Sequence, residues 1–173
     1  KSIGLNKDQF KFHGTDGPHQ AIINADGTIC LGMIDVTHIE KLDVNTFRLN
    51  TGSPHHILFV EDIKQVDVKN EGSSIRNSSQ YAKEGINVNF VQSYGPGEIS
   101  IRTYERGVEH ETMACGTGVV ASAIASFLFT GNPPAHIHTK GGLLGVSFET
   151  EDKKFFADVH LIGPAVKVFE GTI

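Results

Sequence analysis

Cysteine is scarce in this sequence, with only Cys30 and Cys115 among 173 residues. A single disulfide between them is conceivable, but two cysteines cannot supply the several crosslinks that hold a small secreted domain together. We therefore expect a reducing environment and a cytoplasmic protein.

Basic clusters and long apolar runs are also lacking. The formal net charge is −5, from 15 Lys and Arg against 20 Asp and Glu, and no stretch concentrates the basic residues. We therefore expect neither nucleic acid nor an anionic membrane as a partner. No apolar run approaches membrane-spanning length, and residues 1–5 have none of the features of a signal peptide. A content of 39% hydrophobic and 20% charged residues suits a soluble protein with one sizeable domain.

Short strands separated by turn residues are predicted over most of the chain. The predicted strands cover residues 10–13, 19–24, 28–35, 47–50, 57–60, 87–92, 98–104, 135–139, 144–149, 155–160 and 165–169. Asp26-Gly27 stands where a tight hairpin turn is expected. Residues 62–69 are predicted as a short helix, and residues 71–80 as a loop or a frayed helix.

One segment, residues 118–130, differs from the rest because it carries no charge at all. A helix that is apolar or small on every side is buried on every side. Gly131 and two prolines shortly after it are typical of a helix end. The sequence therefore predicts an α+β fold in which a strongly curved, mostly antiparallel, barrel-like sheet is wrapped around one buried central helix.

Cys115 comes directly before this helix, in the run Ala-Cys-Gly-Thr-Gly. Backbone N–H groups at a helix start favour negative charge and would stabilise a thiolate or a bound carboxylate. Glycines on both sides of Thr117 let a ligand approach the backbone closely. A free cysteine in an arbitrary position is more often a small buried hydrophobic residue, but this context favours a catalytic role.

The surrounding motifs resemble the diaminopimelate epimerase family. Residues 102–107 (Arg-Thr-Tyr-Glu-Arg-Gly) and 111–118 (Glu-Thr-Met-Ala-Cys-Gly-Thr-Gly) are similar to its second catalytic half. Residues 50–55 (Asn-Thr-Gly-Ser-Pro-His) and 87–90 (Asn-Val-Asn-Phe) resemble two further motifs of the family, in the expected order. Each motif alone is a weak signal, whereas four in order are a strong one.

The resemblance implies a mechanism that needs no cofactor, neither pyridoxal phosphate nor a metal. In that family two cysteines face each other across the substrate α-carbon, where one removes a proton as thiolate and the other delivers a proton as thiol. Cys115 is then one of the pair. The N–H groups of Gly116 and Thr117 would hold the α-carboxylate, where charge accumulates as the carbanion forms. His55 would lie near the thiol and help to set its proton state.

The resemblance also implies how the distal end of diaminopimelate is held. Arg106 would grip the distal carboxylate, a task for a planar bidentate donor. Glu105 would contact the distal ammonium, and Asn87 would add hydrogen bonds. Ser53 stands where the family has Asn, which shortens one reach to the substrate. Without the resemblance, Arg106 is equally well explained as a surface charge at a strand end, and His55 as a hydrogen-bonded loop histidine.

Other departures from the family concern length. The loop at residues 108–110 is one residue longer than the commonest form, and the Cys-Gly-Asn-type motif of the other catalytic cysteine is absent. Cys30 is no candidate, because its surroundings are those of a strand interior. We expect that the opening third of the family chain is missing here and that residues 1–5 are the end of its first central helix.

The expected organisation follows from this comparison. Residues 1–30 are predicted to be a remnant of the N-terminal epimerase domain, residues 31–162 the C-terminal domain, and residues 163–173 a strand that returns towards the N-terminal domain. The expected partners are the small-molecule substrate diaminopimelate, the missing N-terminal segment and a second copy of the chain in a homodimer. The 173 residues alone are expected to be inactive.

Several alternatives remain at this stage. A related isomerase of the same fold, of the proline racemase or phenazine-pathway type, is the nearest. A hydrolase that uses Cys115 and His55 belongs to a different class, as does a catalytically silent binding or dimerisation fragment. His136 and His138 share a strand face, but no third metal ligand is close in sequence, so a metal site is not expected.

Overall fold

The protein is described as a computed structural model that covers residues 8–14, 17–134, 136–167 and 169–171. Its strands belong to one sheet with the order β1-β2-β3-β12-β11-β10-β8-β7-β6-β5-β4, and β9 pairs with β8 beside this path. The strands are β1 (Gln9–Gly14), β2 (Gly17–Ile23), β3 (Ile29–Gly32), β4 (Ile39–Asp43), β5 (Thr46–Asn50), β6 (Pro54–Phe59), β7 (Asn87–Gly95), β8 (Glu98–Glu105), β9 (His110–Thr112), β10 (His136–Thr139), β11 (Gly142–Glu149) and β12 (Ala157–Gly163).

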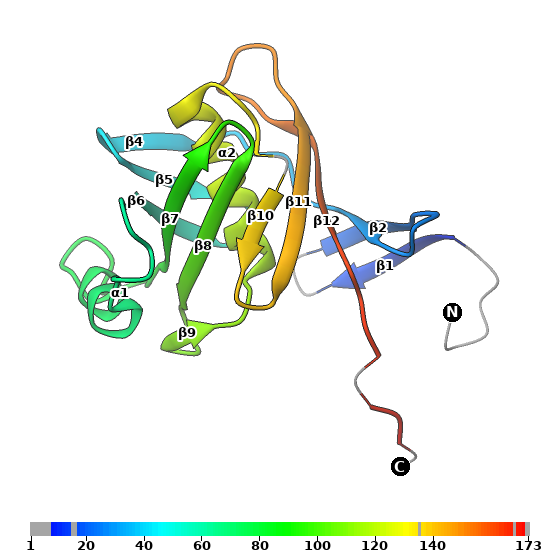
Figure 1. Ribbon diagram of the computed structural model, residues 1–173, viewed down its shortest axis with the longest axis horizontal. Coiled ribbons are helices and arrows are strands. Elements are labelled where there is room, and N and C mark those ends of the chain that lie inside the picture. Colours follow the sequence, from blue (N-terminus) through cyan, green and yellow to red (C-terminus); the bar gives the residue numbers. More distant parts are fainter. Residues whose placement is uncertain (1–7, 15–16, 135, 168, 172–173) are drawn as a thin grey trace.

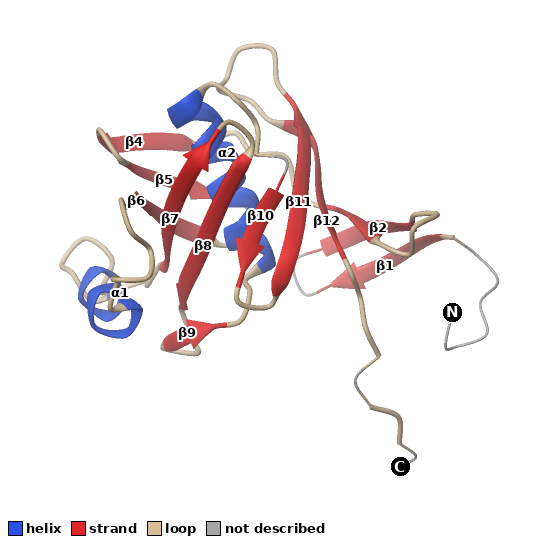
Figure 2. Ribbon diagram, viewed as in Figure 1, coloured by secondary structure: helices blue, strands red, loops and turns tan. Residues whose placement is uncertain are grey.

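The sheet curves around the helix α2 (Gly116–Thr130), as Figures 1 and 2 show. The helix contacts strands from both halves of the sheet, namely β5, β6, β7, β8, β11 and β12. Most strand pairs are antiparallel, but β6 with β7 and β8 with β10 run parallel. The sheet ends at β1 and β4 and is not closed into a barrel. The predicted α+β fold, a curved and mostly antiparallel sheet around a buried helix, is confirmed.

The buried helix owes its position to its apolar composition. Val120, Ala121 and Ile124 are fully buried in a core that also contains side chains from the inner face of the sheet. Gly131 ends the helix with a φ of 83°, a conformation that glycine adopts without strain, and its N–H bonds to the carbonyl of Phe127. The helix end predicted from the sequence is therefore correct.

A second core lies on the other face of β7 and β8, under the helix α1 (Val68–Arg76). Val88 and Phe90 point to this side, whereas Asn87 and Asn89 alternate with them and face α2. The predicted helix at residues 62–69 is wrong except for its last two residues, whereas the predicted loop or frayed helix at 71–80 agrees with a helix that ends at Arg76 and is followed by turns. The helix begins after Asp67, because its carboxylate accepts from the N–H of Asn70 while its own N–H donates to Glu71.

The predicted strands are mostly present, with changes at their ends. The turn at Asp26-Gly27 is confirmed between β2 and β3, and β10 confirms residues 136–139 of the predicted strand 135–139, whose first residue lies outside the described part. β4 and β9 were not predicted. β6 begins at Pro54 rather than at residue 57, which brings His55 into the sheet.

The predicted strand at residues 165–169 is wrong for the part that is described. Residues 164–167 and 169–171 contain no strand, and Val166 and Phe169 are 78% and 84% exposed, so no neighbouring strand or core holds them. The predicted helix end at residues 1–5 lies outside the described residues. Neither α1 nor α2 has both the length and the apolar character that a membrane crossing needs.

Candidate active site

Cys115 lies at the N-cap of α2 and is 9% exposed. The hydroxyl of Thr117 lies 3.5 Å from its sulfur. Burial raises the pKa of the Cys115 thiol, the hydrogen bonds from the Thr117 hydroxyl and the N–H of Gly118 lower it, and the charge of Glu105 raises it again. The net result is a raised pKa of Cys115, so its side chain is a thiol. The hydrogen-bond donors beside it would stabilise a negative charge on the sulfur.

The start of α2 presents backbone donors beside this thiol. The first N–H groups of an α-helix have no acceptor within the helix, and the first intrahelical bond here runs from Val119 to the carbonyl of Cys115. Gly116 and Thr117 are half-buried, so their N–H groups lie near the surface of the site. Such a helix start is suited to bind a carboxylate.

His55 belongs to β6, is completely buried and contacts the first turn of α2. Its Nε2 lies 3.0 Å from Thr117 Oγ1, and its Nδ1 lies 3.0 Å from Asn89 Nδ2. Burial, together with the positive charge of Arg106, lowers the pKa of His55 to about 3, so the ring is neutral at physiological pH. His55 thus reaches Cys115 through Thr117 and not through a direct hydrogen bond.

A second group of predicted residues gathers where β6 begins and β8 ends. Asn87 donates from Nδ2 to Ser53 Oγ at 2.8 Å, and its Oδ1 accepts from the backbone N–H of Arg106 at 2.9 Å. The guanidinium of Arg106 is exposed and donates to the carbonyl of Glu84 at 2.9 Å, with Ser53 Oγ at 3.5 Å. Ser53, Asn87 and Arg106 therefore form one polar cluster that opens to solvent.

Glu105 is the last residue of β8 and directly precedes Arg106. Its charge acts on Cys115, while the residue after it, Arg106, acts on His55. The structure thus brings together all eight residues that the sequence singled out as site residues: Ser53, His55, Asn87, Glu105, Arg106, Cys115, Gly116 and Thr117.

Three further residues of the site were missed by the sequence analysis. Asn89 and Thr103 continue the hydrogen-bonded network behind His55, with Thr103 Oγ1 donating to Asn89 Oδ1 at 2.9 Å. Glu109 accepts from the N–H of Gly107 at 3.1 Å and so holds the turn that carries Arg106. Two asparagines at alternate positions of an apolar strand were a signal for Asn89, because both must share one face. No comparable local signal marks Glu109.

Cys30 is separate from this site. It lies in β3, pairs in register with Ile162 of β12 and carries a free thiol, as Cys115 does. Burial raises the pKa of Cys30, with a further contribution from the negative charge of Asp158. The disulfide that two cysteines allowed is not formed.

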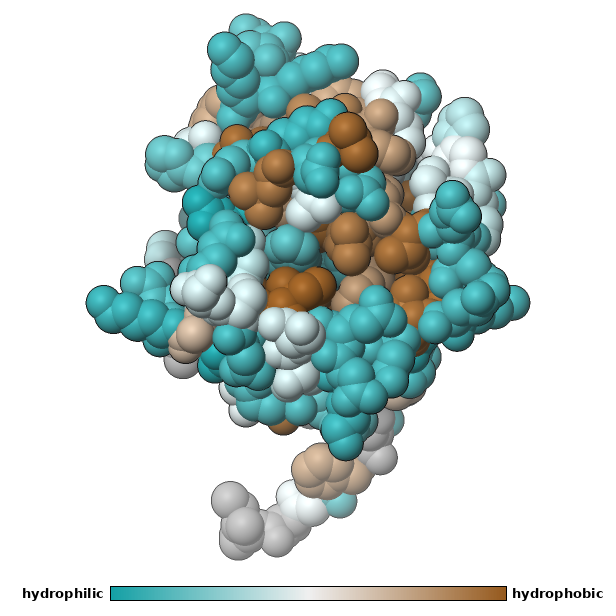
Figure 3. Space-filling model, turned by 90° about the vertical axis from the view of Figure 1, so that its left-hand side faces the viewer, coloured by the Kyte–Doolittle hydropathy of each residue, from teal (hydrophilic) through white to brown (hydrophobic). Residues whose placement is uncertain are grey.

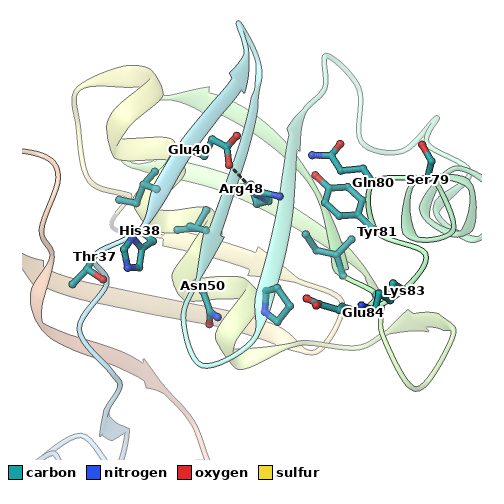
Figure 4. Close-up of a pocket in the computed structure, with 15 residues that line it drawn as sticks. Thr37, His38, Glu40, Arg48, Asn50, Ser79, Gln80, Tyr81, Lys83 and Glu84 are labelled. Atoms are coloured by element: carbon teal, nitrogen blue, oxygen red, sulfur yellow. Dashed lines mark hydrogen bonds and ion pairs between the residues drawn. The ribbon is translucent and has the colours of Figure 1, made fainter.

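A cavity of about 830 Å³ lies on the face of β4 and β5 that is turned away from α2. Glu40 and Arg48 form an ion pair on this face, and Tyr81 and Lys83 approach from the segment before β7 (Figure 4). In Figure 3 the same side of the molecule shows hydrophobic side chains near its centre within a mainly hydrophilic border. Neither Cys115 nor His55 lines this cavity, so it is distinct from the thiol site.

Comparison with known proteins gives a family model and relatives that carry the same description. A family model described as diaminopimelate epimerase matches residues 47–168. A diaminopimelate epimerase of Flavobacterium psychrophilum is 46% identical over 176 residues, which cover 100% of this chain and 68% of that protein. One of Chlorobaculum tepidum is 34% identical and is matched over 95% of this chain and 65% of its own length. This chain thus spans about two thirds of these relatives.

A solved structure shares the fold at low sequence identity. The crystal structure of a Bacillus anthracis phenazine biosynthesis protein of the PhzF family superposes with a TM-score of 0.68 at 14% identity, covering 98% of this chain and 70% of that one. At this identity the similarity concerns the arrangement of the sheet and the central helix alone.

Proposed function

The chain belongs to the diaminopimelate epimerase family, and we propose on that premise that it is the Cys115-bearing part of an isomerase that interconverts LL- and meso-diaminopimelate. The reaction would serve the synthesis of lysine and peptidoglycan precursors in the cytoplasm. The observation that carries this proposal is the thiol of Cys115 at the mouth of α2, beside N–H donors and a buried network of neutral hydrogen-bonding groups.

The proposed chemistry is a proton transfer at the substrate α-carbon. One base removes the α-proton from one face, the pair of electrons left on carbon spreads into the α-carboxylate, and a proton arrives from the other face. Gly116 and Thr117 would bind the carboxylate with their N–H groups and so stabilise the added charge. Cys115 delivers its proton as thiol in one direction and removes a proton as thiolate in the reverse direction, as microscopic reversibility demands.

The distal amino-acid head is proposed to bind at the solvent-facing cluster. Arg106 has the planar guanidinium that pairs with a carboxylate through two parallel hydrogen bonds, and it is held in place through its backbone by Asn87. Glu105 would take the distal ammonium. The hydroxyl of Ser53 already accepts a hydrogen bond from Asn87. Its short side chain therefore positions Asn87 and is not proposed to bind the substrate directly.

The second acid–base group is proposed to come from outside these 173 residues. Cys30 sits within β3, away from any helix start, and is not suited to that part. An N-terminal segment with its own cysteine would supply the group and would exclude water from the reacting carbon. A homodimer is proposed as the assembled state. No cofactor is proposed, and activity should withstand treatment with a metal chelator.

A cysteine hydrolase is less well supported by the geometry. In such enzymes a histidine takes the proton of the thiol directly. Here His55 Nε2 bonds to Thr117 Oγ1, and His55 Nδ1 bonds to Asn89, so both ring nitrogens are engaged by groups other than the sulfur.

The proposal is tested by substrate binding to the chain itself. Addition of meso-diaminopimelate should shift the NMR signals of the Gly116 and Thr117 N–H groups and of the Arg106 side chain. Lysine, which lacks the distal carboxylate, should shift the first two and leave Arg106 unchanged. If diaminopimelate shifts none of these signals, the proposed substrate is wrong.

Turnover provides the second test. Exchange of the substrate α-hydrogen in deuterium oxide should be absent with the chain alone and should appear when the N-terminal segment is added as a separate chain. Exchange and inversion by the chain alone would show that both bases lie within these residues.

A further inference from the structure

A line of polar side chains runs through the core from β8 to the sulfur of Cys115. Thr103 Oγ1 donates to Asn89 Oδ1 at 2.9 Å, and Asn89 Nδ2 lies 3.0 Å from His55 Nδ1. His55 Nε2 lies 3.0 Å from Thr117 Oγ1, which lies 3.5 Å from the sulfur. Thr103, Asn89 and His55 are at most 3% exposed, so water does not compete for these bonds.

The orientation of the Asn89 amide follows from one further neighbour. The carbonyl oxygen of His56 lies 3.4 Å from Asn89 Nδ2. A backbone carbonyl can only accept, so the amide nitrogen must face it; the opposite orientation would set two oxygen acceptors against each other. Asn89 is therefore the donor in its bond to His55 Nδ1.

The direction of the remaining bonds follows in turn. A neutral imidazole has one donor and one acceptor nitrogen, so a ring that accepts at Nδ1 carries its proton on Nε2. Burial and the charge of Arg106 keep the pKa of His55 at about 3, which excludes a second proton at neutral pH. Nε2 then donates to Thr117 Oγ1. Because this oxygen already accepts, its own O–H is left to point at Cys115.

We propose that Asn89 is a positioning residue that sets the tautomer of His55, and that His55 in turn directs the Thr117 hydroxyl to donate to the sulfur of Cys115. This inference rests on the proposed function, because that function requires Cys115 to give up its proton. The task of the network is then to stabilise the thiolate that forms. A donor to the sulfur favours the charged form, and it does so more strongly where water is excluded.

The packing around Asn89 supports a role that depends on its exact position. Gly118, in the first turn of α2, has no side chain, and a Cβ there would lie 2.4 Å from Asn89 Oδ1 and 3.3 Å from His55 Cε1. The amide is thus pressed against the helix that carries Cys115 and cannot rotate freely. The same arrangement makes His55 Nε2 a donor, so His55 does not act as the base that removes the thiol proton.

The first experiment reads the tautomer directly. In the full chain with Cys30→Ser, which leaves Cys115 as the sole thiol, long-range ¹H–¹⁵N NMR should show the proton of His55 on Nε2 with Nδ1 bare. Asn89→Asp replaces the donor with a carboxylate acceptor, so Nδ1 of His55 should become protonated. Protonated Nδ1 in the parent chain, or bare Nδ1 in a folded Asn89→Asp variant, would overturn the proposal.

The second experiment follows the last link, from Thr117 to the sulfur, by the rate of alkylation of Cys115 with iodoacetamide across pH. Thr117→Val keeps the shape and removes the hydroxyl, and it should lower the alkylation rate at neutral pH about tenfold, because one hydrogen bond to a charged group is worth about 1.5 kcal/mol or more. Thr117→Ser should restore the rate. A Thr117→Val variant with an unchanged rate would contradict the proposal even if Asn89→Asp fails to fold.

A double-variant comparison separates the network from simple charge effects. A carboxylate at position 89 also repels a thiolate through space, as Glu105 already does. Asn89→Asp should therefore shift the pH midpoint of the Cys115 alkylation rate more in the parent chain than in Thr117→Val. In Thr117→Val the hydrogen-bonded connection from His55 to the sulfur is already broken. Equal shifts in both backgrounds would show that Asn89 acts by charge alone. None of these measurements requires substrate or turnover, so their outcome is independent of whether the protein epimerises diaminopimelate.

Discussion

The two ends of the candidate site differ in burial and in charge. At the Cys115 end the side chains of Thr103, Asn89 and His55 are buried and neutral, and they bond to one another and to the hydroxyl of Thr117. At the Arg106 end the guanidinium is charged and exposed, and it lies at a turn at the surface.

Under the proposed function, the difference corresponds to two tasks. Carbanion chemistry at an α-carbon needs dry surroundings in which preformed dipoles act strongly. Recognition of a distal carboxylate needs a positively charged group that the ligand can reach from solution. A planar guanidinium suits this task because it donates two parallel hydrogen bonds to the carboxylate. A change at the buried end should therefore alter rate and stability, whereas a change at the exposed end should alter the choice of substrate.

Cys115→Ser is the most severe test of the buried end. A hydroxyl is far less acidic than a thiol, so the variant should lose more than about a hundredfold in turnover, the contribution of a positioned base. The measurement is α-hydrogen exchange in the complex with the N-terminal segment, with circular dichroism to show that the fold is intact. Retention of a tenth of the activity would remove Cys115 from the mechanism.

Acid should destabilise the protein through the same buried end. The pKa of His55 is lowered to about 3, so the unfolded chain gains a proton below its usual pKa of 6.5 while the folded protein does not. Stability is therefore fully present above pH 6.5 and falls as the pH drops towards 3, by about 1.4 kcal/mol per pH unit. His56, whose pKa burial lowers to about 4, adds a similar slope.

Urea unfolding at pH 7, 6 and 5 measures this loss. In His55→Gln the slope of stability against pH should be smaller than in the parent chain by the contribution of one histidine. Identical slopes would mean that His55 does not stay neutral in the folded state.

Gly118→Ala tests how closely the network is packed against α2. Alanine normally stabilises a helix relative to glycine by about 1 kcal/mol. Here the added Cβ would lie 2.4 Å from Asn89 Oδ1, so we expect a destabilisation of about 1–3 kcal/mol instead. Gly171→Ala, outside the helices and with nothing within 4 Å, is the control without a close contact and should stay within about 0.5 kcal/mol. A stabilised Gly118→Ala variant would show that the close approach is not required.

The buried helix and the thiol motif were predictable because their signals are local. The uncharged residues 118–130 and Gly131 carry the helix and its end within one stretch of sequence. The strand that became β8 alternates Ile99, Ile101 and Thr103 on one face, and the structure buries all three. Motif order then predicted the remaining candidate site residues without any knowledge of their contacts.

The features that the sequence did not predict depend on contacts between distant segments. Gly72 lies inside α1, where glycine normally disfavours a helix, and it is explained only by Tyr104, since a Cβ there would lie 2.4 Å from the Cβ of Tyr104. The role of Asn89 depends on the carbonyl of His56 in the neighbouring strand. Alternation shows which face a side chain takes, but it cannot show which way an amide is turned.

Arg106→Lys is the corresponding test of the exposed end. Lysine keeps the charge but loses the bidentate fork, so affinity for diaminopimelate should fall about tenfold, or about 1.4 kcal/mol. Affinity for lysine should stay unchanged, because that ligand has no distal carboxylate. Calorimetry measures both, and Arg48→Lys, on the outer face of β5, is the control that should affect neither. An equal loss for both ligands would place Arg106 elsewhere than at the distal carboxylate.

Glu109→Gln should have the smallest effect, because it acts on the exposed end indirectly. Glu109 has a φ of 57° and accepts from Gly107 N at 3.1 Å, Tyr104 Oη at 3.1 Å and Arg76 Nε at 3.1 Å, so it braces the turn that follows Arg106.

Glutamine keeps the size of the Glu109 side chain and one acceptor oxygen but loses the charge opposite Arg76. Exposed ion pairs contribute about 0.2–1 kcal/mol to stability, so the variant should lose no more than about 1 kcal/mol of stability. Because the turn after Arg106 is held less firmly, diaminopimelate should bind at most about two- to threefold more weakly. Arg76→Gln should reproduce the effect, and the double variant should add little to either, because both changes break the same contact. A tenfold loss in Glu109→Gln alone would mean that Glu109 itself touches the substrate, and the division between a buried reacting end and an exposed recognition end would then have to include the loop that carries it.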